Sequence, residues 1–191
     1  MAERFEIRIA GSGGQGVILA TELIGPAITY HEEGLYVVQS QAYGPEARGG
    51  VSKAETILSS EKIWYSKVTH PDFLLALTQA SLDAYTKTLA DGAVVMMDDS
   101  LTLPKGVDRS RVISIPILRA AKEEVGKAFT ANIVAVGAIN AALRLFKDDI
   151  LLEAVRRHIP AGTEEINKKA LDIGAALIPQ EQADVFAQKL G

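Results

Sequence analysis

The sequence predicts an α/β domain with a Rossmann-like, mostly parallel sheet, flanking helices and one antiparallel β-hairpin. Short apolar segments of strand character alternate with helical segments along the chain. A glycine cluster separates the first strand from the first helix, and a second glycine-rich segment follows the second strand. We expect residues 1–178 to form a single domain and residues 179–191 to form a C-terminal tail.

The first half of the chain contains four predicted strands and one helix. Alternating apolar residues and β-branched content predict strands over residues 5–10, 35–38, 51–58 and 62–65. The last two are expected to form the hairpin, around a turn of Ser59, Ser60 and Glu61. A helix is expected to begin at Val17 and to run to about residue 31.

The second half repeats the strand–helix alternation. Strands are predicted over residues 74–77, 93–97 and 112–115, and helices over residues 81–89, 131–146, 148–158 and 164–178. Thr130 is a candidate N-cap for the helix that follows it. This helix is apolar almost all round, so we expect it to be buried in the core or in an interface.

Composition excludes several classes of protein. The chain has 191 residues, of which 48% are hydrophobic and 23% charged, and a net charge of −4. That charge gives no reason to expect nucleic acid or an anionic membrane as a partner. No apolar run approaches the roughly 20 residues that span a bilayer. The first eight residues carry charges of both signs where a signal peptide needs an apolar block, so we expect a cytoplasmic location.

Cysteine is absent from the sequence. The chain can therefore form no disulfide, thiolate nucleophile or cysteine-type zinc site. It also cannot hold an iron–sulfur cluster alone, because such clusters need several thiolates. Any electron carriers that the protein serves must lie in other chains.

The first glycine loop has the G-x-G-x-x-G spacing at Gly11, Gly13 and Gly16. Because it lies between a strand and a helix, its backbone and the helix N-terminus could approach a phosphate. An NAD site would also need an Asp or Glu at the end of the second strand, where the sequence has Gln39 and Ser40. A phosphate-bearing ligand, a partner surface and a turn without any ligand all remain consistent with the loop.

The second loop, YGPEARGG at residues 43–50, is less generic. It brings Tyr43, Glu46 and Arg48 close together, and the planar guanidinium of arginine suits phosphate or carboxylate. Since it follows the second strand of the sheet, we expect it to line one crevice with the first loop. The alternative is a structural turn held by an internal ion pair between Glu46 and Arg48.

Other polar and aromatic residues give weaker signals. The three histidines are far apart and are expected at the surface, and no catalytic or metal-binding constellation stands out. Asp98 and Asp99 follow an apolar strand, where adjacent carboxylates could bind a cation or ribose but more often cap a turn. Trp64 and Tyr65 belong either to the core or to a subunit contact.

Taken together, these motifs resemble the gamma subunit of 2-oxoacid:ferredoxin oxidoreductases, of the 2-oxoglutarate or branched-chain type, related to the pyruvate enzyme. The resemblance rests on GSGGQGV at residues 11–17 and YGPEARGG at residues 43–50. It continues through residues 51–65, through Pro71 and Asp72, and through TANIVAVG at residues 130–137.

The resemblance implies a subunit without catalytic residues, metal or cofactor of its own. Related complexes convert a 2-oxoacid, coenzyme A and oxidised ferredoxin to acyl-CoA, CO2 and reduced ferredoxin. The implied partners are alpha and beta subunits, a delta subunit where the complex has one, and ferredoxin; the partner subunits carry thiamine diphosphate and iron–sulfur clusters. The residues implied on the coenzyme A side are Gly11, Gly13, Gly14, Gln15, Gly16, Tyr43, Glu46, Arg48 and Gly49.

Two other functions stay open on the residues alone. One is an independent small oxidoreductase that uses NAD or a flavin, and the other is a nucleotide-binding or scaffold module. The subunit hypothesis predicts an isolated chain that is inactive and that forms homo-oligomers through surfaces meant for other subunits.

Overall fold

The computed structural model describes residues 3–29, 34–42 and 50–179. Its strands are β1 Phe5–Ser12, β2 Tyr36–Ala42, β3 Val51–Ser59, β4 Phe73–Ala76, β5 Val94–Asp98 and β6 Val112–Ile115. Its α-helices are α1 Val17–Thr29, α2 Gln79–Tyr85, α3 Ile117–Ala120, α4 Ala131–Leu143, α5 Asp148–His158 and α6 Glu164–Ala176. The predicted tail lies beyond residue 179 and so almost wholly outside the described residues.

The strands form one mixed sheet in the order β2-β3-β1-β4-β5-β6. β1, β4, β5 and β6 are parallel neighbours, whereas β3 runs antiparallel to both β1 and β2. The predicted α/β class, with a mostly parallel sheet, flanking helices and an antiparallel pair, is therefore confirmed. The antiparallel pairing belongs to β3 and its two neighbours.

The strand predicted over residues 62–65 is wrong, because this segment forms no strand. Both edges of β3 are already paired, with β1 on one side and β2 on the other, so no edge is left for a hairpin partner. The hydrogen bonds of the segment go instead to side chains of β1 and the residues before it: the Arg4 guanidinium donates to the Tyr65 carbonyl at 3.1 Å.

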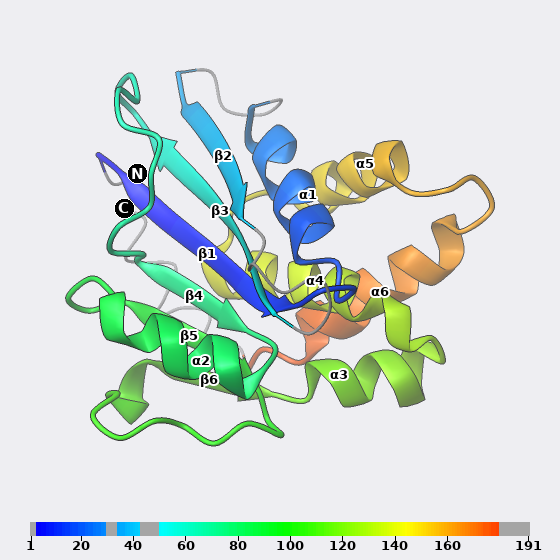
Figure 1. Ribbon diagram of the computed structural model, residues 1–191. Coiled ribbons are helices and arrows are strands. Elements are labelled where there is room, and N and C mark those ends of the chain that lie inside the picture. The colour runs from blue at the N-terminus through cyan, green and yellow to red at the C-terminus, as the bar shows by residue number, and fades with distance from the viewer. Residues whose placement is uncertain (1–2, 30–33, 43–49, 180–191) are drawn as a thin grey trace.

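Helices α1, α3, α4, α5 and α6 lie on one side of the sheet, and α2 lies on the other (Figure 1). Alternating residues of each strand point to the two sides, so Ile7 and Ile9 join the larger core under α1 and α4. Ala10 and Leu74 join a smaller cluster under α2. Within the larger layer, α6 packs against α4, and α5 packs against α1.

Helix α4 is the centre of the larger core. All of its residues except Ala141 are buried, as its apolar sequence predicts. Thr130 occupies the N-cap position of α4, as predicted, but its side chain makes no cap bond, because its hydroxyl donates to the Lys127 carbonyl at 2.8 Å. Glycine lets α6 approach α4 closely: a Cβ at Gly174 would lie 2.0 Å from the Val134 carbonyl oxygen.

None of the described helices has both the length and the apolar character needed to cross a lipid bilayer.

Candidate functional site

The first glycine loop is a tight turn between the end of β1 and the start of α1. The Gln15 amide oxygen accepts a hydrogen bond from the Ser12 N–H at 2.7 Å, and the Gln15 N–H donates to the Ser12 carbonyl at 3.2 Å. Gly14 has φ 90° and Gly16 has φ 69°, which is the left-handed region that favours glycine. The Gln15 side chain therefore holds the loop from within.

The outer part of this loop is open. Gly13 and Gly14 are exposed, and a Cβ built on either would meet no atom within 4 Å. The first N–H groups of α1 have no acceptor within the helix, and no acidic side chain lies in its first turn. These N–H groups and the partial positive charge of the helix N-terminus suit an anionic group.

The inner side of the loop packs against α4. A Cβ at Gly16 would lie 2.5 Å from the Asn132 side-chain nitrogen, and that nitrogen lies 3.5 Å from the Gly16 carbonyl oxygen. Asn132 is itself only 5% exposed. The sequence motif at residues 130–137 contained this residue, but only the tertiary structure reveals that it supports the glycine loop.

The second glycine-rich loop connects β2 to β3. Tyr43, Glu46, Arg48 and Gly49 lie outside the described residues, so the predicted cluster stays a prediction. The flanking strands are described: Ser12, the last residue of β1, pairs with Val51, and Ala42, the last residue of β2, pairs with Lys53. Both loops therefore start from the same edge of the sheet, as predicted.

A shallow groove of about 200 Å³ lies between the first turns of α1 and the end of β2. Its lining includes Ile18, Thr21 and Glu22 from α1, and Gln39 and Gln41 from β2. The Gln39 amide nitrogen donates to the Thr21 carbonyl and joins the two elements. The groove reaches Ile18, two residues after the first glycine loop, and Gln41, two residues before the second.

The strand order argues against a dinucleotide site. In a Rossmann domain the strand that carries the ribose-binding acid lies directly beside the first strand. Here β3 lies between β1 and β2, so the end of β2 lies two strand spacings, or roughly 10 Å, from β1 instead of one spacing. The end of β2 also carries Gln39, Ser40 and Gln41 in place of an acid.

The carboxylates after β5 have structural roles. Asp98 is 2% exposed and accepts hydrogen bonds from the Ser100 N–H at 3.1 Å and the Leu118 N–H at 2.8 Å. Asp99 pairs with Arg119 at 2.9 Å. Turn capping is thus the role of Asp98, whereas Asp99 forms an ion pair. Within residues 3–29, 34–42 and 50–179, no group of acidic and histidine side chains is placed to hold a metal ion.

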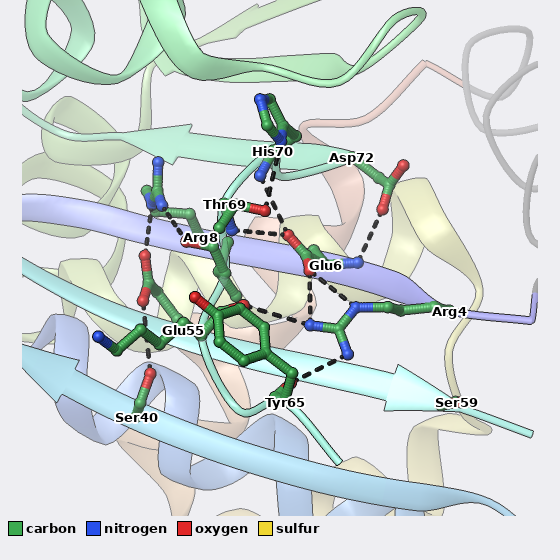
Figure 2. Close-up of polar contacts among 12 residues, drawn as sticks. Arg4, Glu6, Arg8, Ser40, Glu55, Ser59, Tyr65, Thr69, His70 and Asp72 are labelled. Atoms are coloured by element: carbon green, nitrogen blue, oxygen red, sulfur yellow. Dashed lines mark hydrogen bonds and ion pairs between the residues drawn. The ribbon is translucent and has the colours of Figure 1, made fainter. Parts of the chain in front are cut away.

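A second polar cluster lies on the α2 side of β1 and β3 (Figure 2). The Arg8 guanidinium pairs with Glu55 at 2.6 Å, and both side chains are less than a tenth exposed. Arg8 also donates to the Val68 carbonyl at 3.1 Å, and its guanidinium carbon lies 4.9 Å from the centre of the Tyr85 ring. These groups are occupied with one another, so this cluster is structural.

Comparison with known proteins gives a consistent assignment. The family model for pyruvate ferredoxin/flavodoxin oxidoreductase matches residues 6–177. The 2-oxoglutarate synthase subunit KorC of Methanothermobacter marburgensis is 42% identical over 185 residues, which cover 94% of this chain and 99% of the relative.

Two solved structures are similar to this fold. The keto/oxoacid ferredoxin oxidoreductase gamma subunit of Geobacter sulfurreducens has a TM-score of 0.78 and 38% identity, over 96% of this chain and 98% of its own. The 2-oxoglutarate:ferredoxin oxidoreductase of Magnetococcus marinus has a TM-score of 0.74 at 22% identity, over 100% of this chain and 32% of its own, and shares the fold. The chain therefore belongs to the pyruvate ferredoxin/flavodoxin oxidoreductase family, as a gamma subunit of the 2-oxoacid:ferredoxin oxidoreductase type.

Proposed function

We propose that this gamma subunit supplies the coenzyme A side of the active complex, with the two glycine loops as walls of one crevice. The observation that carries the proposal is the open backbone of Gly13 and Gly14 at the N-terminus of α1, next to the strand pairing of Ser12 with Val51, where the second loop ends. The phosphates of coenzyme A are the anions that such a backbone suits. Arg48 is the cation of the second loop that we expect to bind them.

The chemistry of the reaction belongs to partner subunits on this proposal. Thiamine diphosphate, when bound in a partner, supplies the decarboxylation of the 2-oxoacid, and iron–sulfur clusters there transfer electrons to ferredoxin. A chain without cysteine cannot supply the cluster ligands itself. The role of its residues is to bind and orient coenzyme A and to contact alpha and beta subunits, and a delta subunit where one is present.

We further propose 2-oxoglutarate as the 2-oxoacid of the complex. The relative that is 42% identical over almost the whole of both chains is a 2-oxoglutarate synthase subunit. The Magnetococcus enzyme, which shares the fold, was solved with 2-oxoglutarate, coenzyme A and succinyl-CoA bound. An independent NAD-dependent enzyme is disfavoured, because β3 separates β2 from β1 and no acid lies at the end of β2.

The test uses the assembled complex with Gly13→Val in this subunit. Because a Cβ at Gly13 meets no atom within 4 Å, the change should leave folding unaffected and place a side chain where the ligand would approach. We expect the KM for coenzyme A to rise about tenfold, the effect of losing one charge-assisted hydrogen bond. Arg48→Ala should have an effect of the same size, with Arg48→Lys restoring part of it.

Decarboxylation of the 2-oxoacid in the absence of coenzyme A should be nearly unchanged in both variants. The matched control is Ala161→Val, in an exposed turn between α5 and α6, which should change neither parameter. If the variants impair assembly and the residual complex keeps its KM for coenzyme A, the loops are subunit contacts and the proposal is wrong.

A further inference from the structure

The segment between β3 and β4 is held in place by side chains of β1 and the residue before it. We refer to residues 60–70 as the anchored segment. Its backbone contacts are the Tyr65 and Lys67 carbonyls with Arg4, the Val68 carbonyl with Arg8, and the Thr69 and His70 N–H groups with Glu6. Figure 2 shows the side chains of Arg4 and Glu6 next to each other and directed toward this segment. Side-chain hydrogen bonds to five of its backbone groups therefore fix this irregular segment.

The anchored segment exposes two large aromatic side chains. Trp64 is 84% exposed and Tyr65 is 56% exposed. The Lys62 ammonium lies 4.4 Å from the centre of the Trp64 ring, within the range of a cation–π contact. A rigid backbone that presents Trp and Tyr to solvent loses little conformational entropy on binding, and these two residue types are enriched among energetically dominant interface residues.

The sheet itself is incompletely covered on this side. Helix α2, with seven residues, and the segments that carry Leu89, Leu101 and Leu103 cover an apolar cluster of this side that comes from β1, β4 and β5. Tyr36, which pairs with Ser59 and lies on the same side as Ser40 and Glu55, is 48% exposed. Mostly parallel sheets are normally covered on both faces, and among the described helices none lies over β2 on this side (Figure 1). We refer to Tyr36, Trp64 and Tyr65 as the aromatic face.

The charges beside the aromatic face argue against a second copy of the chain as its occupant. In a two-fold contact the same patch meets itself, and the anchored segment exposes two cations, Lys62 and Lys67, against one carboxylate, Glu61. Surfaces of like net charge would then be brought together in a partly dehydrated contact, at an energetic cost. A carboxylate opposite Lys62 would be favourable. Lys67, two residues after Tyr65, is also exposed and adds a second cation for such a surface.

We propose that the aromatic face binds another subunit of the same oxidoreductase, through an apolar pocket for Trp64 that is bordered by carboxylates facing Lys62 and Lys67. This inference rests on the proposed function, since it needs the complex to exist. The relation to longer chains supports it: this chain covers only 32% of the Magnetococcus oxidoreductase chain. A domain of this kind therefore occurs covalently joined to further parts of that enzyme.

Trp64 is the only tryptophan of the chain, which allows a direct test. The gamma subunit, produced with fluorine-labelled tryptophan, is mixed with its unlabelled partner subunits, and the single fluorine NMR resonance is followed. We expect a solvent-exposed resonance in the free subunit that shifts and loses its response to heavy water when the complex forms. A complex that forms with an unchanged, solvent-exposed resonance overturns the inference.

Affinity measurements give the second part of the test. We expect Trp64→Ala and Lys62→Glu each to weaken association with the partner subunits at least tenfold, without lowering the Tm of the free subunit. Phe129→Ala, which removes another exposed aromatic ring, and Lys122→Glu, which reverses another exposed lysine, are the matched controls and should leave the affinity within about twofold.

The outcomes separate this inference from the proposed function. If the unmodified subunit binds no partner subunits at all, the proposed function fails. If it binds them and both variants bind equally well, only the aromatic face is excluded. If the resonance of the free subunit changes with its own concentration and Trp64→Ala abolishes this change, the occupant is a second copy, and the proposed partner is wrong.

Discussion

The two faces of the sheet are built by different means. Under α1 and α4, strand residues such as Ile7 and Ile9 are apolar, and the helices pack at backbone contact through Gly137 and Gly174. On the other face the same strand carries Glu6 and Arg8, both less than a tenth exposed, and their side chains bind the backbone of the anchored segment. One side is closed by helices, whereas the other is closed by α2 over a small apolar cluster and, beside it, by charges that bind backbone.

This difference shows how a strand can serve two layers at once. Apolar side chains need only volume to be filled, so helices of regular shape can cover them. Buried charges need defined partners, and here they obtain them from the backbone of the anchored segment and from Glu55. The charged face therefore fixes an irregular loop in one conformation. The helices on the apolar face need no such polar anchors.

The largest expected effect comes from breaking the charged face. Arg8→Met removes the partner of Glu55 and leaves that carboxylate buried, with Lys53 at 2.8 Å as its remaining cation. Breaking a buried pair costs about 3–5 kcal/mol, and Lys53 should keep the loss near the lower value. The free energy of unfolding, measured by denaturant titration, should fall accordingly.

The double variant Arg8→Met/Glu55→Met tests whether the loss comes from the unpaired charge. It should recover most of the stability, because no buried carboxylate then lacks its arginine. The matched control is Lys168→Met, which breaks the exposed pair with Asp172 and should change stability by no more than about 0.5 kcal/mol. A double variant no more stable than Arg8→Met would show that the contacts of Arg8 with the Val68 carbonyl and Tyr85 matter more than its charge.

The next effect concerns the helical face. Gly174→Ala places a methyl group 2.0 Å from the Val134 carbonyl oxygen, so α6 must move away from α4. We expect a loss of about 1–3 kcal/mol, typical of an overpacked core, and a corresponding fall in the Tm on heating. In an exposed helix interior the same change would stabilise by up to roughly 1 kcal/mol, so the sign of the effect is diagnostic.

Asp172→Ala, at an exposed position of the same helix, serves as the control and should leave the Tm nearly unchanged. If Gly174→Ala were neutral or stabilising, the helices would not be held at backbone contact. The close packing of this face would then be incorrect, and the contrast between the two faces would weaken.

The sequence predicted the helical face better than the charged one. Apolar periodicity and glycine punctuation located β1, β4, β5, β6 and most helices, since these signals are local. The strand predicted at residues 62–65 failed because pairing partners are not local: β3 is inserted between β1 and β2 and has no free edge. Nothing in the sequence near residue 65 indicates that Arg4 would bind its carbonyl.

The candidate site was predictable to a similar extent. Strand, glycine loop and helix occur in order, so the placement of Gly11 to Gly16 at a strand end followed from the sequence. The packing of Asn132 against Gly16 did not, because the two are 116 residues apart and meet only when α4 crosses beneath α1. Trp64 and Tyr65 could not be assigned to core or surface until the anchors of their backbone were known.

The smallest expected effect tests how well α2 closes the charged face. Burial raises the pKa of the Tyr85 hydroxyl, and nearby Glu55 adds to the rise, while Arg8 opposes it. The folded state then keeps the Tyr85 proton to higher pH than the unfolded state. The stabilisation that comes from this difference is therefore fully present below the ordinary pKa of 10.0 and is lost as the pH rises above it.

Tyr85→Phe keeps the ring over Arg8 and removes the titration. Comparing denaturant titrations at neutral pH and above pH 10, we expect the wild type to lose more stability than Tyr85→Phe. Equal losses would mean that solvent reaches this hydroxyl freely and that α2 covers the charges less completely than the helices cover the opposite face.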